Sequence, residues 1–376
     1  AEGRGLDVAT VKTLFDKGSM TAEEAKKSKL IDTILYPDQV LGMVKEGTKI
    51  MSMRGYIKSM EKQEKKKQSP LMSQTDDKPK IALITMTGTI IRGFGDSTSR
   101  NSQIASEKAM AAIRGAYRDK TVKAIVVRID SRGGSAVASD SIRRELERAK
   151  EAGKPVVVSM GNFAASGGYY ISTAADKIIA QPGTITGSIG VIFGKMVIGK
   201  MLDQIGINHD DVHRGENADA MSQFRPFSKD QAELADKLGR NVYNDFTQLV
   251  MDARKLSAEE VDKVARGRVW TGEQAKELSL VDELGGLQDA YLLAGKLIGM
   301  EKDIPKLVDY PKAKTGLEKA VAILSGEKQE GGLSDGGDPA VAPAAAMLEG
   351  TGVGELADAV RALSSVVEVA RRAGLV

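Results

Sequence analysis

The sequence predicts an α/β fold built on a mostly parallel sheet, and three observations lead to this prediction. From Lys80 onward, short apolar runs alternate with amphipathic helical stretches. Three glycine-rich turns come at or near the carboxyl ends of the predicted strands. The chain of 376 residues is long enough for a large core and for more than one compact unit. Strands that alternate with helices in this way are typical of parallel pairing.

The elements of this domain are expected in regular alternation. Strands are predicted over residues 81–86, 122–129, 156–160 and 178–180, and helices over 106–117, 136–152 and 166–174. Helical patterns over 229–254 and 258–278 follow them. The predicted domain spans residues 80–308.

Composition changes on both sides of this domain. Residues 46–79, which include the polar run 58–70, are predicted to form a charged linker, and residues 309–346, rich in Gly, Pro and Ala, a second linker. Apolar residues then recur at alternating steps of four and three, at Leu356, Val360, Leu363, Val367 and Ala370. Residues 347–376 are therefore expected to form a C-terminal helix that packs on the body or on a partner.

Composition also excludes several classes of function. Charged residues make up 28% of the chain, but the net charge is only +3, which is too small to indicate a nucleic-acid partner. The absence of cysteine excludes disulfides, thiolate metal sites and a cysteine nucleophile. No apolar run approaches the roughly 20 residues that a membrane-spanning helix needs.

An internal repeat links the two ends of the chain. Residues 6–32 align without a gap on residues 256–282, with identities that include Thr21/Thr271, Leu30/Leu280 and Asp32/Asp282. Chance similarity between amphipathic helices is the alternative. The threonine that caps the helix and the Leu-(Ile/Val)-Asp sequence that follows the helix are matched in both copies, which argues against chance. Residues 1–45 are therefore expected to be the C-terminal end of a truncated first repeat, whose second copy closes the domain at 80–308.

The glycine-rich turns lie at residues 130–135, 162–170 and 186–190. Each alone is by default a structural turn, but together they are typical of a catalytic site. A serine hydroxyl such as that of Ser166 becomes a nucleophile when a base removes its proton. The backbone N–H groups of Gly133, Gly134 and Gly167 are candidates to hold the oxygen that becomes negative. The alternative is that Ser166 only caps a helix.

The residues do not reveal an obvious base for Ser166. His209 and His213 occur in a polar stretch with nothing to tie them to the serine. Their spacing with Asp210 and Asp211 also fits a metal site, but exposed positions of a strand explain it equally, and we expect no metal. A lysine can act as a base when burial lowers its pKa, yet Lys195 and Lys200 lie in an amphipathic stretch that favours solvated side chains.

The three motifs, S-x-G-G-S-x-x-A-S at 131–139, A-A-S-G-G-Y-Y at 164–170 and T-G-S-I-G at 186–190, resemble the signal peptide peptidase family, also called protease IV. The resemblance covers roughly residues 80–287. It implies the stacked ββα units of the Clp protease and crotonase fold, followed by C-terminal helices, and peptide cleavage by a serine–lysine dyad. Ser166 matches the family nucleophile, and Gly133, Gly134 and Gly167 match its oxyanion hole. The resemblance also implies that Ser188 orients the lysine.

Two positions depart from the family pattern. Arg132 stands where the family commonly has proline, and Ala218 stands where short members carry the lysine base. Long members are tandem duplications in which the first copy supplies the lysine and the second supplies the serine. The resemblance therefore implies that this chain carries the nucleophile and the oxyanion hole, that the base lies upstream of Ala1, and that the chain alone is inactive.

The resemblance further implies a serine endopeptidase that degrades signal-peptide remnants or other apolar extended peptides without a cofactor. Expected partners are these peptides, the first-repeat domain and further copies of the protein. The expected location is a bacterial inner membrane, facing the periplasm or another extracytoplasmic side. The alternatives are a non-catalytic scaffold repeat of the same fold, a phage head-maturation protease and a crotonase-like acyl-CoA enzyme, the last of which would not need Ser166.

Overall fold

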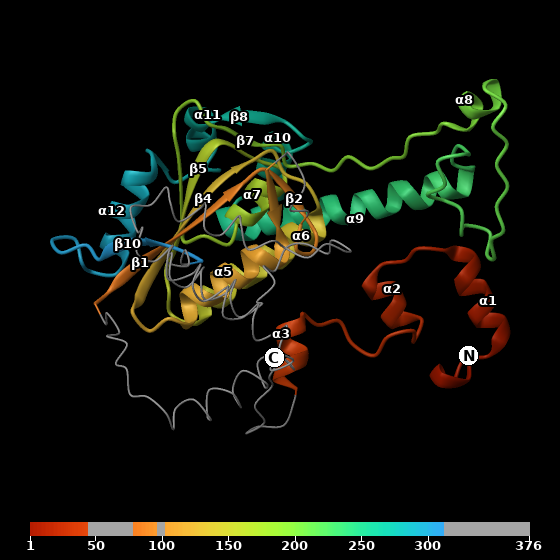
Figure 1. Cartoon of the computed structure of the whole chain (residues 1–376), viewed down its shortest axis with the longest axis horizontal. Coiled ribbons are helices and arrows are strands. Elements are labelled where there is room, and N and C mark those ends of the chain that lie inside the picture. Colours follow the sequence, from red (N-terminus) through yellow and green to blue (C-terminus); the bar gives the residue numbers. More distant parts are fainter. Residues whose placement is uncertain (44–77, 96–101, 312–376) are drawn as a thin grey trace, which may run out of the picture.

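The computed structural model describes residues 1–43, 78–95 and 102–311 (Figure 1). Most of the predicted linker at 46–79, most of the second linker at 309–346 and the whole predicted C-terminal helix at 347–376 lie outside the described residues. The boundaries of the predicted domains stay a prediction.

The core is a twisted parallel sheet, and the predicted α/β class is confirmed. Its main path runs in the order β10-β1-β4-β5-β6-β9, and each neighbouring pair is parallel. These strands are β1 (Lys80–Thr87), β4 (Val122–Ser131), β5 (Val156–Ala165), β6 (Lys177–Ala180), β9 (Glu283–Leu284) and β10 (Lys306–Asp309). Residues 125–127 of β4 are fully buried although they point alternately to the two faces, because helices cover both sides of the sheet.

The helices form two layers. On one face, α5 (Ser106–Arg118), α6 (Ala136–Glu151) and α7 (Gly167–Ser172) pack with the long α9 (Lys229–Arg254) in the larger apolar core. On the other face, α12 (Leu287–Leu297) places Ala290 and Ala294 against the strand residues Ala124, Val126 and Val157. The small residues on α12 allow the helix to approach the sheet closely.

The periodicity does not predict four short strands, two of which extend the main sheet while the other two form a separate two-stranded sheet. β7 (Ile185–Gly187) runs parallel to the end of β5 and antiparallel to β8 (Val269–Thr271), and β2 (Thr89–Ile91) pairs with β3 (Gln103–Ala105). The predicted helical stretch 258–278 is wrong as a single unit. It divides into α10 (Ala258–Val264), β8 and α11 (Gly272–Glu277), because Arg266 and Gly267 both have a positive φ and turn the chain into the strand.

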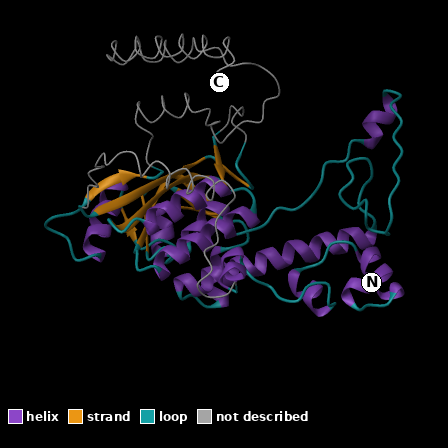
Figure 2. Cartoon of the chain, turned by 60° about the horizontal axis from the view of Figure 1, so that its bottom comes forward, coloured by secondary structure: helices purple, strands orange, loops and turns teal. Residues whose placement is uncertain are grey.

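An arm of residues 190–228 extends from the body between β7 and α9 and carries α8 (Gly199–Gln204) at its far end (Figures 1 and 2). Several of its apolar side chains are exposed, including those of Ile192, Met196, Ile205 and Val212. No helix within the described ranges is long and apolar enough to cross a membrane.

The N-terminal segment repeats the end of the domain in three dimensions. It contains η1 (Glu2–Arg4), α1 (Val8–Lys17), α2 (Ala22–Lys27) and α3 (Pro37–Gly42). Thr21 and Thr271 each cap a six-residue helix through a capping box. Arg4 donates to the Lys29 carbonyl at 2.7 Å and pairs with Asp32, and Arg254 donates to the Ser279 carbonyl at 2.7 Å and pairs with Asp282. Lys29 and Ser279 share a φ of 60°.

The two copies differ in what covers them. In the second copy Val281 and Ala290 are 2% and 0% exposed, because they pack against the sheet. The equivalent residues of the first copy, Ile31 and Val40, are 37% and 51% exposed. The same local structure therefore forms twice, but only the second copy has a sheet beneath it among the described residues.

Candidate functional site

Ser166 lies at the junction between the end of β5 and the start of α7, in an unusual backbone conformation. Its φ is 51° and its ψ is −117°, a region that residues with a Cβ rarely adopt. It occupies the N-cap position of α7, yet its side chain makes no capping hydrogen bond within the described part of the chain. The hydroxyl is therefore not used to cap the helix, which removes the structural alternative for this serine.

The turn at residues 186–190 lies beside Ser166. Pairing of β7 with β5 places Gly187 opposite Ala165, and the Ser166 N–H donates to the Gly187 carbonyl at 2.9 Å. Ser188 follows directly, with a φ of 49° and its own N–H bonded to the Arg268 carbonyl at 2.7 Å. The backbone of Ser188 is thus held through its N–H, directly after the glycine that is bonded to Ser166.

The turn at residues 130–135 approaches Ser166 from β4. A Cβ added to Gly133 would lie 2.8 Å from the Cβ of Ser166 and 2.8 Å from the Gly167 nitrogen. A Cβ added to Gly134 would lie 2.1 Å from the Ile90 carbonyl oxygen. Both residues have a positive φ, so glycine is required here for conformation as well as for space. The structure therefore brings together all three predicted turns.

The N–H groups of the three glycines have different partners. The Gly133 N–H donates to the Ser131 hydroxyl at 3.1 Å, and that hydroxyl donates to the Gly88 carbonyl at 2.6 Å. The N–H groups of Gly134 and Gly167 have no acceptor among the described residues. A Cβ added to Gly167 would lie 3.3 Å from the Gly134 nitrogen, so the two free donors are neighbours. In this conformation they are better placed than Gly133 to bind a negative oxygen.

Arg132, the expected departure from the family pattern, does not prevent the turn from forming. Its guanidinium lies 4.4 Å from the centre of the Phe163 ring, on the neighbouring strand. This contact holds the arginine away from the backbone of the two glycines.

The basic residues considered as partners for Ser166 lie on the arm. Lys195 donates to the Ala220 carbonyl at 2.8 Å and lies 4.4 Å from the Phe227 ring centre, and Lys200 is exposed on α8. Ala218 is also on the arm, where the neighbouring Asn217 donates to the Asp16 carbonyl at 2.8 Å. Figure 1 shows the arm directed away from α7, so the structure does not bring these residues to the serine.

The two histidines occupy the same arm. His209 stacks on Phe224 with ring centres 3.7 Å apart, and His213 lies 2.7 Å from an Asp211 oxygen. Asp211, His213 and Asp219 could offer ligand atoms within 4.8 Å of one another. Arg225, however, contacts the carboxylates of both Asp211 and Asp219 and supplies the positive charge there.

A cavity of about 480 Å³ lies beside the first turn of α6, close in sequence to Gly134 but without Ser166 in its wall. It is lined by Arg92, Gly93, Ser106, Glu107, Val137, Ala138 and Ser141.

Comparison with known proteins identifies the family. The model of "Peptidase family S49" matches residues 148–301. The chain is 36% identical to a putative protease of Synechocystis sp. over 241 residues, which are 64% of this chain and 82% of that protein. The chain belongs to peptidase family S49. Its fold is accordingly of the Clp protease and crotonase type, as predicted.

Two further relatives of this S49 chain are much longer than it is. Serine protease SPPA, chloroplastic, of Arabidopsis thaliana is 34% identical over 333 residues, 87% of this chain and 48% of that protein. Protease 4 of Salmonella typhi is 42% identical over 232 residues, 62% of this chain and 37% of that protein. The chain thus spans about half or less of the length of these relatives.

Sequence reasoning missed the polar residues that join the N-terminal segment to this S49 domain. Tyr36 and Asp38 contact α6, and neither position belongs to a recognisable motif. The one signal in the sequence is that Tyr36 and Asp38 are not repeated in the second copy, which has Gly286 and Gln288 at the equivalent positions. This difference could have indicated that the two residues serve a contact particular to the first copy.

Proposed function

We propose that this chain supplies the nucleophile and the oxyanion hole of a serine endopeptidase of the serine–lysine type, and that the lysine belongs to a preceding repeat. The observation that carries the proposal is the convergence of the three glycine-rich turns on Ser166. Its strained backbone, its uncommitted hydroxyl and two adjacent free N–H groups are what acyl transfer to a serine requires.

In the proposed reaction a neutral lysine amine accepts the proton of the Ser166 hydroxyl as its Oγ bonds to the peptide carbonyl carbon. The N–H groups of Gly134 and Gly167 hold the oxygen that becomes negative. The carbon–nitrogen bond then breaks, and the lysine ammonium returns the proton to the leaving amine. Water, with the lysine again as base, releases the acyl group from Ser166. Ser188, held next to Ser166, orients the lysine.

Two observations support a base from another repeat. The position expected to carry the lysine in short members is Ala218, on the arm and away from α7. The N-terminal segment has the same caps, ion pair and left-handed turn as the end of the domain, and its exposed apolar side chains match those that the second copy packs on its sheet. These side chains would pack on a first ββα body, and that body would supply the lysine. The greater length of the relatives also supports the presence of such a body.

We further infer that the substrates are apolar extended peptides, such as signal-peptide remnants, because Protease 4 and a putative signal peptide peptidase of Enterococcus faecium are among the relatives. Assembly of several copies on the extracytoplasmic side of a bacterial membrane belongs to the same proposal. The scaffold and phage-protease alternatives have no specific observation in their favour.

The test uses a serine-directed fluorophosphonate probe and a peptide substrate on two proteins: this chain, and the same chain preceded by a first repeat. We expect the longer protein to be labelled at Ser166 and to cleave peptides, and the shorter chain to be nearly inactive. In the longer protein, Ser166→Ala should lower turnover by at least about a thousandfold. Lys195→Met is the control, and it should leave labelling unchanged because Lys195 is bonded within the arm.

Two results would contradict the proposal. Equal peptidase activity of the two proteins would show that the base lies within this chain. Absence of any Ser166-dependent label or activity in the longer protein would favour the non-catalytic scaffold.

A further inference from the structure

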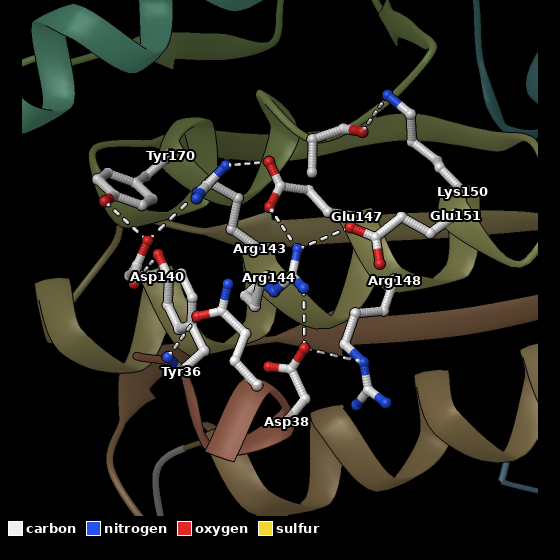
Figure 3. A network of polar contacts seen from close by, with 12 residues as sticks. Tyr36, Asp38, Asp140, Arg143, Arg144, Glu147, Arg148, Lys150, Glu151 and Tyr170 are labelled. Atoms are coloured by element: carbon white, nitrogen blue, oxygen red, sulfur yellow. Dashed lines mark hydrogen bonds and ion pairs between the residues drawn. The ribbon is translucent and has the colours of Figure 1, made fainter. Parts of the chain in front are cut away.

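The carboxylate of Asp140 joins three parts of the chain (Figure 3). One oxygen accepts a hydrogen bond from the Tyr36 hydroxyl at 3.0 Å. The other accepts from the Tyr170 hydroxyl at 3.2 Å and from Arg143 Nε at 3.3 Å. Asp140 therefore has donors from the N-cap residue of α3, from α7 and from its own helix α6.

Two of these elements carry the candidate catalytic groups. α6 begins directly after the Gly133–Gly134 turn, with Ser135 as its N-cap. α7 begins directly after Ser166, and the Tyr170 N–H donates to the Ser166 carbonyl at 2.8 Å. The bond between Asp140 and Tyr170 thus connects the helix behind the oxyanion hole to the first turn of the nucleophile helix.

The third element is the end of the N-terminal segment. Besides Tyr36, Asp38 pairs with Arg144 at 2.8 Å and lies 3.5 Å from Arg148 Nε, and the Arg144 guanidinium lies 5.5 Å from the Tyr36 ring centre. These pairs are partly shielded from water, because the side chains of Asp38 and Arg144 are 16% and 17% exposed. Shielded pairs of this kind are screened less by salt than pairs on an open surface.

The ionisation of the groups is consistent with this network. Burial raises the pKa of the Tyr170 hydroxyl, and the nearby Asp140 carboxylate raises it further. Burial is also the larger cause that raises the pKa of the Tyr36 hydroxyl, and Asp140 is the second. Both phenols therefore stay protonated and donate hydrogen bonds. The hydrogen bond from Arg144 lowers the pKa of Asp38, which stays charged.

The repeat shows that this contact is particular to the first copy. The two copies share Thr21/Thr271 and Asp32/Asp282, which stabilise each copy internally, but Tyr36 and Asp38 correspond to Gly286 and Gln288. In the second copy the helix that starts here, α12, packs on the sheet. In the first copy the equivalent α3 contacts α6 through its polar side chains instead.

We propose that Asp140 is a positioning residue, and that Tyr36 and Asp38 are the contact through which the first repeat is held in register with the helices that carry Ser166 and the oxyanion hole. This rests on the proposed function. Because the base belongs to the first repeat, the alignment of the two repeats sets the distance between lysine and serine. A contact that ties the end of the first repeat to both helices reduces the freedom of that alignment.

The test measures kcat, KM and thermal midpoint in the protein that contains both repeats. Tyr36→Phe removes one hydroxyl and should lower kcat about fivefold with KM nearly unchanged, since a hydrogen bond of this kind changes an equilibrium by about that factor. Tyr117→Phe is the matched control. Tyr117 also donates to a carboxylate of α6, that of Glu145 at 2.7 Å, but within the described chain its hydroxyl makes no hydrogen bond to α3, to α7 or to Asp140. Arg148 keeps its own ion pairs with Glu145 and Asp38 when this hydroxyl is removed, so kcat should stay unchanged.

Two further variants separate positioning from simple stability. Asp38→Glu keeps the ion pair and should retain kcat, whereas Asp38→Asn should lower it. Asp38→Asn and Arg144→Gln together should lower kcat by less than the product of the two single effects, because both remove the Asp38–Arg144 ion pair. Each change also removes a contact of its own, that of Asp38 with Arg148 and that of Arg144 with Glu151.

The proposal is overturned if Tyr36→Phe and Tyr117→Phe have the same kcat, or if Tyr36→Phe changes the thermal midpoint alone. Ser166→Ala in the same protein tests the proposed function separately. If that variant is inactive while Tyr36→Phe behaves as the control does, the positioning role fails and the proposed function stands. If Ser166→Ala keeps its activity, the proposed function itself fails.

Discussion

Replacement of Ser166 by glycine should make the protein more stable while it abolishes the reaction with a serine probe. The φ of 51° and ψ of −117° at this position are unfavourable for any residue with a Cβ but accessible to glycine. Ser166→Ala keeps the Cβ and should therefore keep the backbone strain. The two variants lose the same hydroxyl, and they differ in the backbone strain and in the greater conformational freedom of the unfolded glycine.

The size of the effect follows from two opposing contributions. A backbone held in such a region costs roughly 1–3 kcal/mol. Glycine loses more freedom on folding than alanine does, which offsets about 0.5–1 kcal/mol of the gain. We therefore expect Ser166→Gly to exceed Ser166→Ala by about 1 kcal/mol in the free energy of unfolding. With a urea slope of roughly 2 kcal/mol per molar, the midpoint should rise by about 0.5 M.

The assay is urea unfolding of both variants at pH 7, followed by probe labelling. Ser257→Gly is the matched control, because Ser257 also occupies an N-cap position but has an ordinary φ of −71° and accepts a hydrogen bond from the Glu260 N–H. Glycine at that position should lower stability by a few tenths of a kcal/mol. The two serine-to-glycine changes should thus have opposite signs.

Equal stability of Ser166→Gly and Ser166→Ala, or a lower stability of the glycine variant, would contradict this prediction. That result would mean that the surrounding turns do not impose the positive φ on residue 166. Labelling of either variant at the level of the wild type would show that the probe reacts elsewhere.

Two further predictions test the turn and the ion pair of the repeat. Gly134→Ala should destabilise the fold by about 3 kcal/mol and reduce Ser166 labelling, because its Cβ would lie 2.1 Å from the Ile90 oxygen; Gly183→Ala, where no atom lies within 4 Å, should change neither in the same assays. Burial opposes ionisation of Asp282, but hydrogen bonds from Arg254 and the Ile178 N–H outweigh it and lower its pKa. Because the pKa of Asp282 is lower in the folded state, its ionisation stabilises the fold at any pH above its unfolded-state pKa of about 4. This stabilisation is lost as the pH falls through the folded-state pKa. Asp282→Asn should therefore cost about 1–2 kcal/mol at pH 7 and little near pH 2 in urea unfolding, and a pH-independent cost would contradict this.

Much of the site could be predicted because its parts are local. The glycines at 133, 134 and 167 mark turns that need a positive φ or a close approach, and these requirements are visible in residue type alone. The alternation of apolar strands and amphipathic helices likewise predicts the layers. The amphipathic pattern did not predict the break of the 258–278 stretch. Arg266 and Gly267 turn the chain with a positive φ, and pairing of β8 with β7 then holds residues 269–271 as a strand.

The assignment of individual N–H groups required the folded chain. Sequence reasoning treats Gly133 and Gly134 alike, but the Ser131 hydroxyl accepts the Gly133 N–H and leaves the one at 134 free. Only the folded chain also shows that the lysines and histidines at 195–213 are not placed beside Ser166, because they lie on an arm directed away from α7.

The sequence by itself determined the fold class, the three turns, the serine between them and the presence of a second copy of the closing element, because each depends on residues close together in the chain. Only the tertiary structure decided that the turns meet, that Ser166 is held at a positive φ, and that Asp140 joins Tyr36 to Tyr170. Those contacts bridge residues up to 104 positions apart. Their formation depends on how the sheet and its helices pack, which no local pattern encodes.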